Sequence, residues 1–243
     1  MGMPISLEIA DPSVSEEPFE KAFAYFRYVD EKFSTYKNTS EITQINNGEL
    51  ELSASSEDMK TVFALSKETK EKTNGYFDIV AQNGKFDPSG LVKGWSIFNA
   101  SKILLELGFD NFYIDAGGDI QVHGKNSKGA KWKVGILNPF NPKEIIKVVY
   151  ITDEEIATSG TYIRGEHIYN PKDKNKPITE IVSLTVIGLN IYEADRFATA
   201  AFAMGKAGIM FIEKLEGFEG YMIDKKGVAT MTSGFAKYTK END

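Results

Sequence analysis

The chain contains no cysteine and only two histidines among its 243 residues. Without cysteine it cannot form disulfides, zinc–thiolate sites, iron–sulfur clusters or thiol nucleophiles, and no lipid can be attached through a thiol. It also lacks any run of about 18 apolar residues, the length that a membrane-spanning helix needs. Thiol chemistry is therefore excluded, and no transmembrane segment is expected.

Positive charge is scarce as well. Lysine and arginine together number 28 against 35 acidic residues, a formal net charge of -7, and no dense basic block occurs. A sequence-independent nucleic-acid binder needs a basic surface to neutralise phosphates, so we expect no nucleic-acid partner. The N-terminus lacks the basic-then-apolar layout of a secretory signal. We expect a cytoplasmic protein, with an exported form whose signal has been removed as the alternative.

The hydrophobic content of 42% and the charged content of 26% are those of an ordinary globular protein. We expect one domain over 1–243, with two tightly packed lobes as the alternative arrangement. Apolar residues at helical spacing predict helices, and runs rich in β-branched and aromatic residues predict strands. The helices are predicted over 16–37, 57–73, 89–107, 192–205 and 206–215, and the strands within 111–124, 131–139, 145–151, 181–189, 219–223 and 227–231. Because the two kinds of element do not alternate regularly, the pattern favours an α+β fold with largely antiparallel strands over a doubly wound sheet.

The most informative segment is YEADRFATAAFAMG (192–205), a helical run of small residues. Asp195 and Thr199 are four residues apart in it, so their oxygens can converge on one cation. Mg²⁺ prefers such hard oxygen ligands, and it usually takes few from the protein, leaving the rest of its octahedron to water and substrate phosphates. The alternative is structural, with the aspartate capping a helix and the threonine bonding back to its own helix.

Two glycine-containing turns are further candidates for ligand contact. FDPSGLVKGW (86–95) is a turn that opens a helix, with Lys93 in the expected first turn, and it can offer N–H groups and a cation to a phosphate or a carbonyl to a metal. A plain turn and helix start is the alternative. DAGGDI (115–120) allows close backbone approach at its glycines, with Asp119 available to a ribose or adenine edge, although a simple hairpin turn explains it equally well.

The segment 157–177 is rich in turn formers, is predicted to be a loop, and holds His167. A loop histidine with a pKa near neutrality is a natural general base. No serine stands in a nucleophile elbow, so the hydroxyl that His167 activates would come from water or from another protein. The second histidine, His123, falls on a predicted strand and is interpreted as structural.

Several segments, in this order, resemble the ApbE family of FAD:protein FMN transferases, and the resemblance covers nearly the whole chain. The segments that carry it are MGMPISLEI, FSTYKNTSEITQIN (33–46), NGYFDI (74–79), DPSGLVKGW (87–95), DAGGD (115–119), ATSG with HIYNP (157–171) and ADRFATA (194–200). The resemblance implies the ApbE-like, T-fold-like architecture. It also implies a Mg²⁺-dependent transferase that cleaves FAD and attaches FMN through a phosphoester bond to a threonine of an acceptor protein, with release of AMP.

The resemblance also implies roles for individual residues. Asp195, Thr199 and the carbonyl of Gly90 match the metal ligands, and His167 matches the histidine that activates the acceptor threonine. The positions that match FAD contacts are Met1, Tyr36, Tyr76, Phe77, Asp78, Asp87, Lys93 and Ile168, to which Asp119 is added as a further polar candidate. Core packing is the alternative role of Phe77.

The chain departs from the family pattern at two positions, with Asn170 where aspartate is more frequent and Met3 where a small hydroxyl residue is usual. Two other functions remain open. One is a binding or storage protein that holds FAD without transferring it, and the other is a hydrolase that splits FAD into FMN and AMP with water as the nucleophile.

Overall fold

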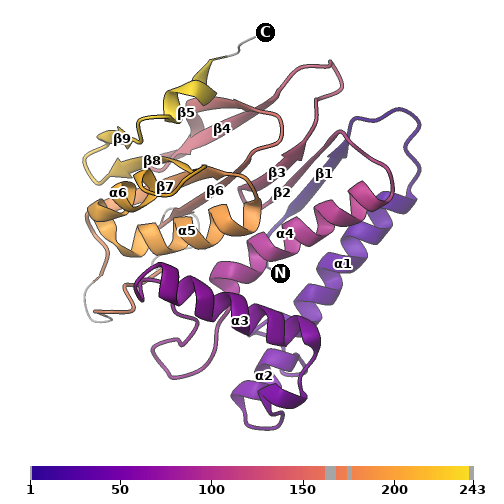
Figure 1. Cartoon of the computed structure of the whole chain (residues 1–243), viewed down its shortest axis with the longest axis vertical. Helices are drawn as coiled ribbons and strands as arrows, with labels where there is room; N and C mark the ends of the chain where they lie inside the picture. The colour runs from indigo at the N-terminus through magenta and orange to yellow at the C-terminus, as the bar shows by residue number, and fades with distance from the viewer. Residues whose placement is uncertain (1, 162–167, 174–176, 241–243) are drawn as a thin grey trace.

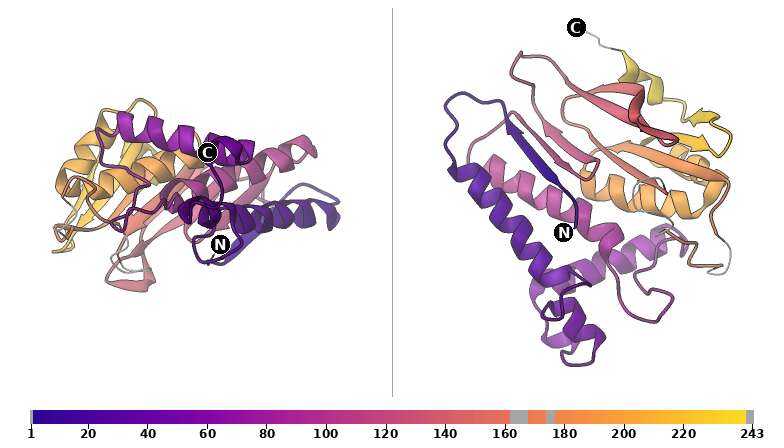
Figure 2. Two further views of the ribbon diagram at one scale, coloured as in Figure 1. Left: turned by 90° about the horizontal axis from the view of Figure 1, so that it is seen from below. Right: turned by 180° about the vertical axis from the view of Figure 1, so that it is seen from behind.

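The fold is a large antiparallel sheet with helices on one face and a β-hairpin on the other (Figure 1). The computed structural model describes residues 2–161, 168–173 and 177–240. Seven strands follow the order β1-β2-β3-β6-β7-β8-β9, and every neighbouring pair is antiparallel. The predicted α+β class with antiparallel strands is confirmed. Seen from behind in Figure 2, β1 and β9 form the two edges of this sheet.

The strands of the large sheet are short, and successive side chains along each strand point to opposite faces of the sheet. Their bounds are β1 (Ile5–Ile9), β2 (Phe112–Ala116), β3 (Asp119–His123), β6 (Glu155–Gly160), β7 (Ile181–Gly188), β8 (Glu219–Asp224) and β9 (Ala229–Met231). The separate hairpin consists of β4 (Trp132–Asn138) and β5 (Asn141–Ile151). Strand β5 begins four residues before the predicted start at 145.

The helices are α1 (Glu17–Phe33), α2 (Glu41–Asn46), α3 (Glu57–Lys72), α4 (Ser89–Glu106), α5 (Ile191–Ala203) and α6 (Gly208–Glu213), with three short 3₁₀ helices, η1 (Leu52–Ala54), η2 (Gly205–Ala207) and η3 (Phe235–Thr239). The segment predicted as one helix over 206–215 is thus η2 followed by α6. Helix α3 begins where the Ser56 hydroxyl accepts a hydrogen bond from the Met59 N–H, and it ends before Asn74, whose φ is 51°.

Besides the short 3₁₀ helices η1 and η3, three elements have no counterpart among the predicted ones. Strand β1 and helix α2 are too short to give a clear periodic pattern. The third is a correction, because 155–160 forms strand β6 between β3 and β7, whereas the sequence from 157 was interpreted as loop. Glu155 and Ile156 pair with β3, and the small residues that follow, such as Ser159, pair with β7, which compensates their weak strand preference.

The buried apolar residues form three separate clusters. Phe112, Ile114 and Leu184 of the sheet pack with α1, α4 and α5. On the opposite face, Ile120 and Ile223 pack with the β4-β5 hairpin and with η3. A third cluster joins α1, α2, α3 and α4 below the sheet, in the lower part of Figure 1. No helix of the described residues is both long and apolar enough to cross a membrane.

Candidate active site

A pocket lies where the start of α4 and the middle of α5 meet the ends of β6 and the β2-β3 turn. The pocket is partly open to solvent. The residues that line it are Tyr76, Phe77, Asp78, Ala81, Asp87, Ser89, Gly90, Lys93, Gly117, Thr158, Ser159, Gly160, Ile168, Tyr169, Pro171, Asp195, Thr199 and Ala203. Nine of the predicted site residues are in this set: Tyr76, Phe77, Asp78, Asp87, Gly90, Lys93, Ile168, Asp195 and Thr199. Tertiary structure therefore brings together segments more than 100 residues apart in the sequence.

Helix α5 places Asp195 and Thr199 on the pocket wall. Its N-cap is Asn190, whose Oδ1 accepts a hydrogen bond from the Glu193 N–H at 2.9 Å. Asp195 is therefore not the helix cap, and the capping role suggested as its alternative is wrong. The hydroxyl of Thr199 lies 3.4 Å from the hydroxyl of Ser159, which β6 carries. The wall thus presents a carboxylate and two hydroxyl groups.

The approach of α4 to α5 depends on Gly94. A Cβ atom at Gly94 would lie 2.8 Å from both the Asp195 Cβ and the Ile191 carbonyl oxygen, so only glycine fits there. The Gly94 N–H donates to Asp195 Oδ2 at 2.8 Å. In a regular helix this N–H donates to the carbonyl four residues earlier, which is that of Gly90. Asp195 thus competes for the donor that would otherwise occupy the carbonyl predicted as a metal ligand.

Lys93 connects two buried carboxylates. Its ammonium forms an ion pair with Asp119 and lies 3.6 Å from Asp195 Oδ1. Burial raises the pKa of Asp195 to about 8, with Lys93 opposing the shift and Asp119 adding to it. Lys93 is the fifth residue of α4 and so begins its second turn, one turn later than expected. When both carboxyl groups are ionised, one cation faces two negative charges.

These groups fit a hard divalent cation. Among the described residues no three acidic or histidine side chains are grouped to hold a metal. A site with one carboxylate, the Thr199 hydroxyl and a backbone carbonyl nevertheless matches the habit of Mg²⁺, which keeps several positions for water and substrate phosphates. The predicted roles of Asp195, Thr199 and Gly90 as ligands stay predictions.

The β2-β3 turn fixes Asp119 at the side of the pocket. Gly117 and Gly118 both have positive φ, 65° and 93°, as a two-residue type I′ hairpin turn requires. The hairpin interpretation of DAGGDI is confirmed. The Asp119 side chain is buried, accepts a hydrogen bond from the Thr158 N–H at 3.1 Å and faces Lys93. Its suggested contact with a ribose or adenine edge stays a prediction.

The segment 74–87 forms the opposite wall. Phe77 is buried in the lower core, as the structural alternative proposed, and its ring also borders the pocket. Asp78 accepts hydrogen bonds from Lys70 at 2.7 Å and from the Val80 N–H at 3.0 Å. Asp87 accepts from the Ser89 N–H at 3.0 Å, so it also stabilises the start of α4 as a plain turn would.

The segment around 168–173 borders the pocket mouth. The Tyr169 hydroxyl donates to the Val80 carbonyl at 3.1 Å, and the Lys172 ammonium lies 4.5 Å from the centre of the Tyr76 ring. Neither residue was among the predicted site residues, although Tyr169 lies within the quoted HIYNP segment. Ser159 was missed in the same way, within ATSG. Tyr169 and Ser159 could have been found from the motifs that contain them, whereas Lys172 lies one residue beyond HIYNP.

Two predicted residues that the structure describes, Tyr36 and Asp119, are not among those that line the pocket. Met1 and His167 lie outside the described residues. Tyr36 follows α1 with 96% of its surface exposed, and it is not among the residues that line the pocket. His123 ends β3 and pairs with Asp153 at 3.0 Å, in agreement with a structural role.

Comparison with known proteins places this architecture. The ApbE family model matches residues 1–84 and 80–222, which is most of the chain. The chain belongs to the ApbE family. The FAD:protein FMN transferase of Vibrio cholerae is 27% identical over 165 residues, and the aligned part covers 64% of this chain and 48% of that protein. The FAD:protein FMN transferase of Haemophilus influenzae is 23% identical over 300 residues, covering 95% of this chain and 86% of that protein.

Among solved structures, the ApbE protein of Thermotoga maritima superposes with a TM-score of 0.88 at 20% identity, covering 99% of this chain and 97% of that one. At this identity the likeness shows the fold. The chain matches about half the length of the V. cholerae relative.

Proposed function

We propose that this ApbE-family protein is a Mg²⁺-dependent FAD:protein FMN transferase. It would move FMN from FAD to a threonine hydroxyl of an acceptor protein. The observation that carries the proposal is the meeting of Asp195, Thr199 and Gly90 with Lys93 on one wall of a single pocket. The names of the relatives and the family match support it.

The reaction is a phosphoryl transfer. The threonine oxygen attacks the phosphorus on the FMN side of the FAD pyrophosphate, the bridging P–O bond breaks, and AMP leaves with the bonding electrons. The hydroxyl proton passes to a base, the role we assign to His167. Bound Mg²⁺ would neutralise charge on the phosphate oxygens, the effect on which such transfers chiefly depend.

Other residues of the pocket would bind the cation and contact FAD. Asp195, Thr199 and the Gly90 carbonyl would hold the cation, and Lys93 would keep the neighbouring Asp119 carboxylate from repelling the phosphates. The half-buried Tyr76 and the ring edge of Phe77 would supply apolar surface to the flavin or adenine. Asp78 and Asp87 lie where they can accept hydrogen bonds from a ligand at the pocket mouth.

The test is incubation of the protein with FAD, Mg²⁺ and an acceptor protein that contains the candidate threonine, followed by intact-mass measurement of both proteins. Transfer adds the mass of FMN, less water, to the acceptor and releases AMP. Release of FMN and AMP without modification of the acceptor would instead indicate a FAD pyrophosphatase. Saturable FAD binding without either product would indicate a storage protein.

His167→Ala separates transfer from binding. We expect it to retain FAD affinity and to lose FMN transfer by roughly 100-fold or more, the usual contribution of a general base. Normal transfer by this variant would place the base elsewhere.

A further inference from the structure

Helix α5 carries a second functional candidate beside its metal-binding face. Arg196 directly follows Asp195 and is the largest fully buried side chain of the described residues. Successive residues of a helix point about 100° apart, so Asp195 faces α4 while Arg196 faces a different neighbour, α3. None of the motifs or predicted site residues assigns a role to it.

The guanidinium of Arg196 is held by contacts on two helices. Its Nη2 donates to Glu193 of its own helix at 2.7 Å, and its Nη1 donates to the Thr69 hydroxyl of α3 at 3.0 Å. Both terminal nitrogens lie 3.4 Å from Glu68, also on α3. The guanidinium carbon lies 4.6 Å from the ring centre of Tyr192, a cation–π contact.

Such a buried charge is costly unless its partners are held in place. Nε of Arg196 has no hydrogen-bond partner among the described residues, so the side chain is not fully compensated. A leucine or methionine would bury the same surface without this cost. Unlike such an apolar side chain, the arginine ties α5 to α3 through directional contacts, which fix the position of one helix against the other.

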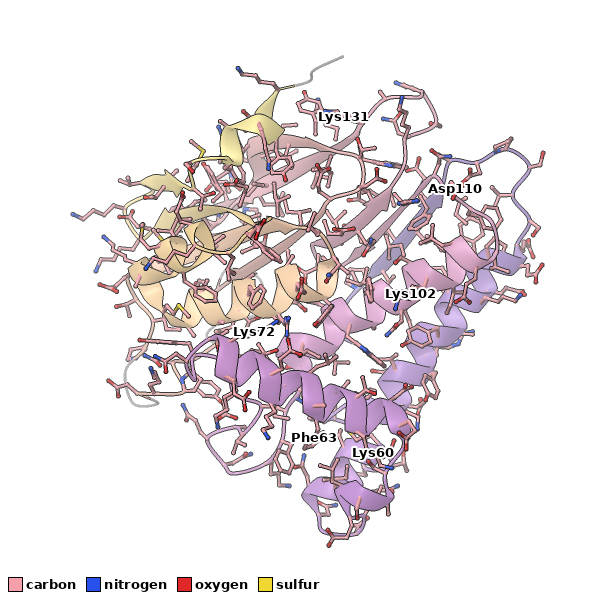
Figure 3. The ribbon with its side chains drawn as sticks, viewed as in Figure 1. Lys60, Phe63, Lys72, Lys102, Asp110 and Lys131 are labelled. Carbon is pink, nitrogen blue, oxygen red and sulfur yellow. The ribbon has the colours of Figure 1, made fainter. Side chains whose placement is uncertain are left out.

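A hydrogen-bonded path leads from Arg196 to the pocket. The Thr73 hydroxyl donates to the Thr69 carbonyl at 2.7 Å, and the Phe77 N–H donates to the Thr73 hydroxyl at 3.1 Å. Phe77 borders the pocket beside Tyr76. In Figure 3 the labelled Lys72 marks the end of α3 that lies next to α5, whereas Lys60 lies at the distant end.

We propose that Arg196 is a positioning residue that fixes the flavin-binding wall at 76–78 against the metal-binding wall of α5. The proposal rests on the proposed function, because it assumes that the two walls hold one FAD molecule and its cation. Without the arginine, part of the binding free energy of FAD would be spent on bringing α3 and α5 into register. FAD affinity would fall although Arg196 touches no ligand.

The test is titration of FAD, followed by flavin fluorescence in the presence of Mg²⁺, with wild type and three variants. Arg196→Met removes the guanidinium and its contacts with α3 and keeps an apolar side chain of similar length. Thr69→Val removes the hydroxyl that accepts from Arg196 and keeps its shape. Ser66→Ala is the matched control, because Ser66 is a buried hydroxyl of the same helix that donates only to the Val62 carbonyl within α3.

We expect Arg196→Met to weaken FAD binding about tenfold and Thr69→Val to weaken it about threefold. The double variant should bind no more weakly than Arg196→Met alone, because the two residues act through one contact. Amide exchange at Phe77 should rise in both variants. Ser66→Ala should keep its FAD affinity within about twofold of wild type at a comparable loss of Tm.

The outcomes are distinguishable. If Arg196→Met lowers Tm but binds FAD as wild type does, the residue is only structural and the inference is overturned. If that variant does not fold, Thr69→Val against Ser66→Ala decides, and equal affinities for the two would overturn it. A wild type that binds no FAD would overturn the proposed function and this inference with it.

Discussion

Two carboxyl groups are buried beside strand β3, and they differ in what surrounds them. Asp195 lies near Lys93 and Asp119, the first residue of the strand, and it borders the pocket. Glu155, on β6, pairs with Gln121, two residues further along β3, whose amide donates to it at 2.6 Å. Burial raises the pKa of both groups, to about 8 for Asp195 and to about 9 for Glu155.

The difference teaches what a perturbed pKa can and cannot identify. Glu155 has a neutral partner, its pKa is raised further by nearby Glu154 and Asp153, and it is not among the residues that line the pocket. The Asp195 cluster has a cation, a second carboxylate and an opening to ligand. Both carboxyl groups are buried, but only the surroundings of Asp195 offer a place for chemistry.

The sharpest separation of the two sites should come from Asp195→Asn. This change keeps the shape of the side chain and removes a metal-ligating charge, so we expect Mg²⁺-dependent FMN transfer to fall by roughly 1000-fold. Tm should stay close to that of wild type, because an uncharged amide is cheaper to bury. Steady-state transfer over a range of Mg²⁺ concentrations, with Tm measured alongside, checks this. Wild-type rates at limiting Mg²⁺ would refute the metal assignment.

Removing the Lys93 ammonium should leave the Asp195 site without a cation, as the Glu155 site is. Lys93→Met leaves Asp119 and Asp195 buried without their shared partner, and breaking such a pair typically costs about 3 kcal/mol of unfolding free energy. Urea unfolding near neutral pH measures the loss. A variant as stable as wild type would show that the ammonium is not needed to bury the two carboxylates.

Glu155→Gln should act on stability and leave transfer unchanged. In the folded chain Glu155 keeps its proton up to about pH 9, whereas in the unfolded chain it loses it near 4.5. Between these values the folded state binds the extra proton, so stability falls as pH rises. The amide removes this dependence, and we expect Glu155→Gln to exceed wild type by about 1–3 kcal/mol at pH 8.5 and to match it at pH 4.5.

Urea unfolding at the two pH values measures this effect, with Glu216→Gln on the surface as the control for loss of an acidic charge. Equal stability of wild type and Glu155→Gln at pH 8.5 would mean that the carboxyl of Glu155 is not perturbed by burial.

The smallest effect is expected far from both carboxyl groups. Tyr36 is almost fully exposed, so Tyr36→Ala should leave Tm unchanged. If the ring covers bound FAD, as the family resemblance implies, its loss should weaken FAD binding roughly 3- to 10-fold, the value of one aromatic contact. Flavin fluorescence titration decides, and unchanged affinity would remove Tyr36 from the site.

Much of this architecture could be predicted because periodic, apolar segments carry their own signal. The helices over 57–73 and 89–107 match α3 and α4 to within one residue at each end. Strand β6 was not predicted, because Ala157, Ser159 and Gly160 have a weak strand preference and are held in the strand by pairing with β7. The same applies to β1, which pairs with β2 across more than 100 residues of sequence.

For the site, the sequence by itself determined which groups are available: oxygen ligands without thiols, a carboxylate and a hydroxyl four residues apart, and glycines beside them. Only the tertiary structure decided their partners. It placed Asp195 against Gly94, gave Lys93 two carboxylates in place of a free approach to phosphate, and turned Arg196 toward α3. The physical reason is that spacing along a helix fixes a direction, whereas charge compensation, burial and pKa depend on whichever segments the fold packs into that direction.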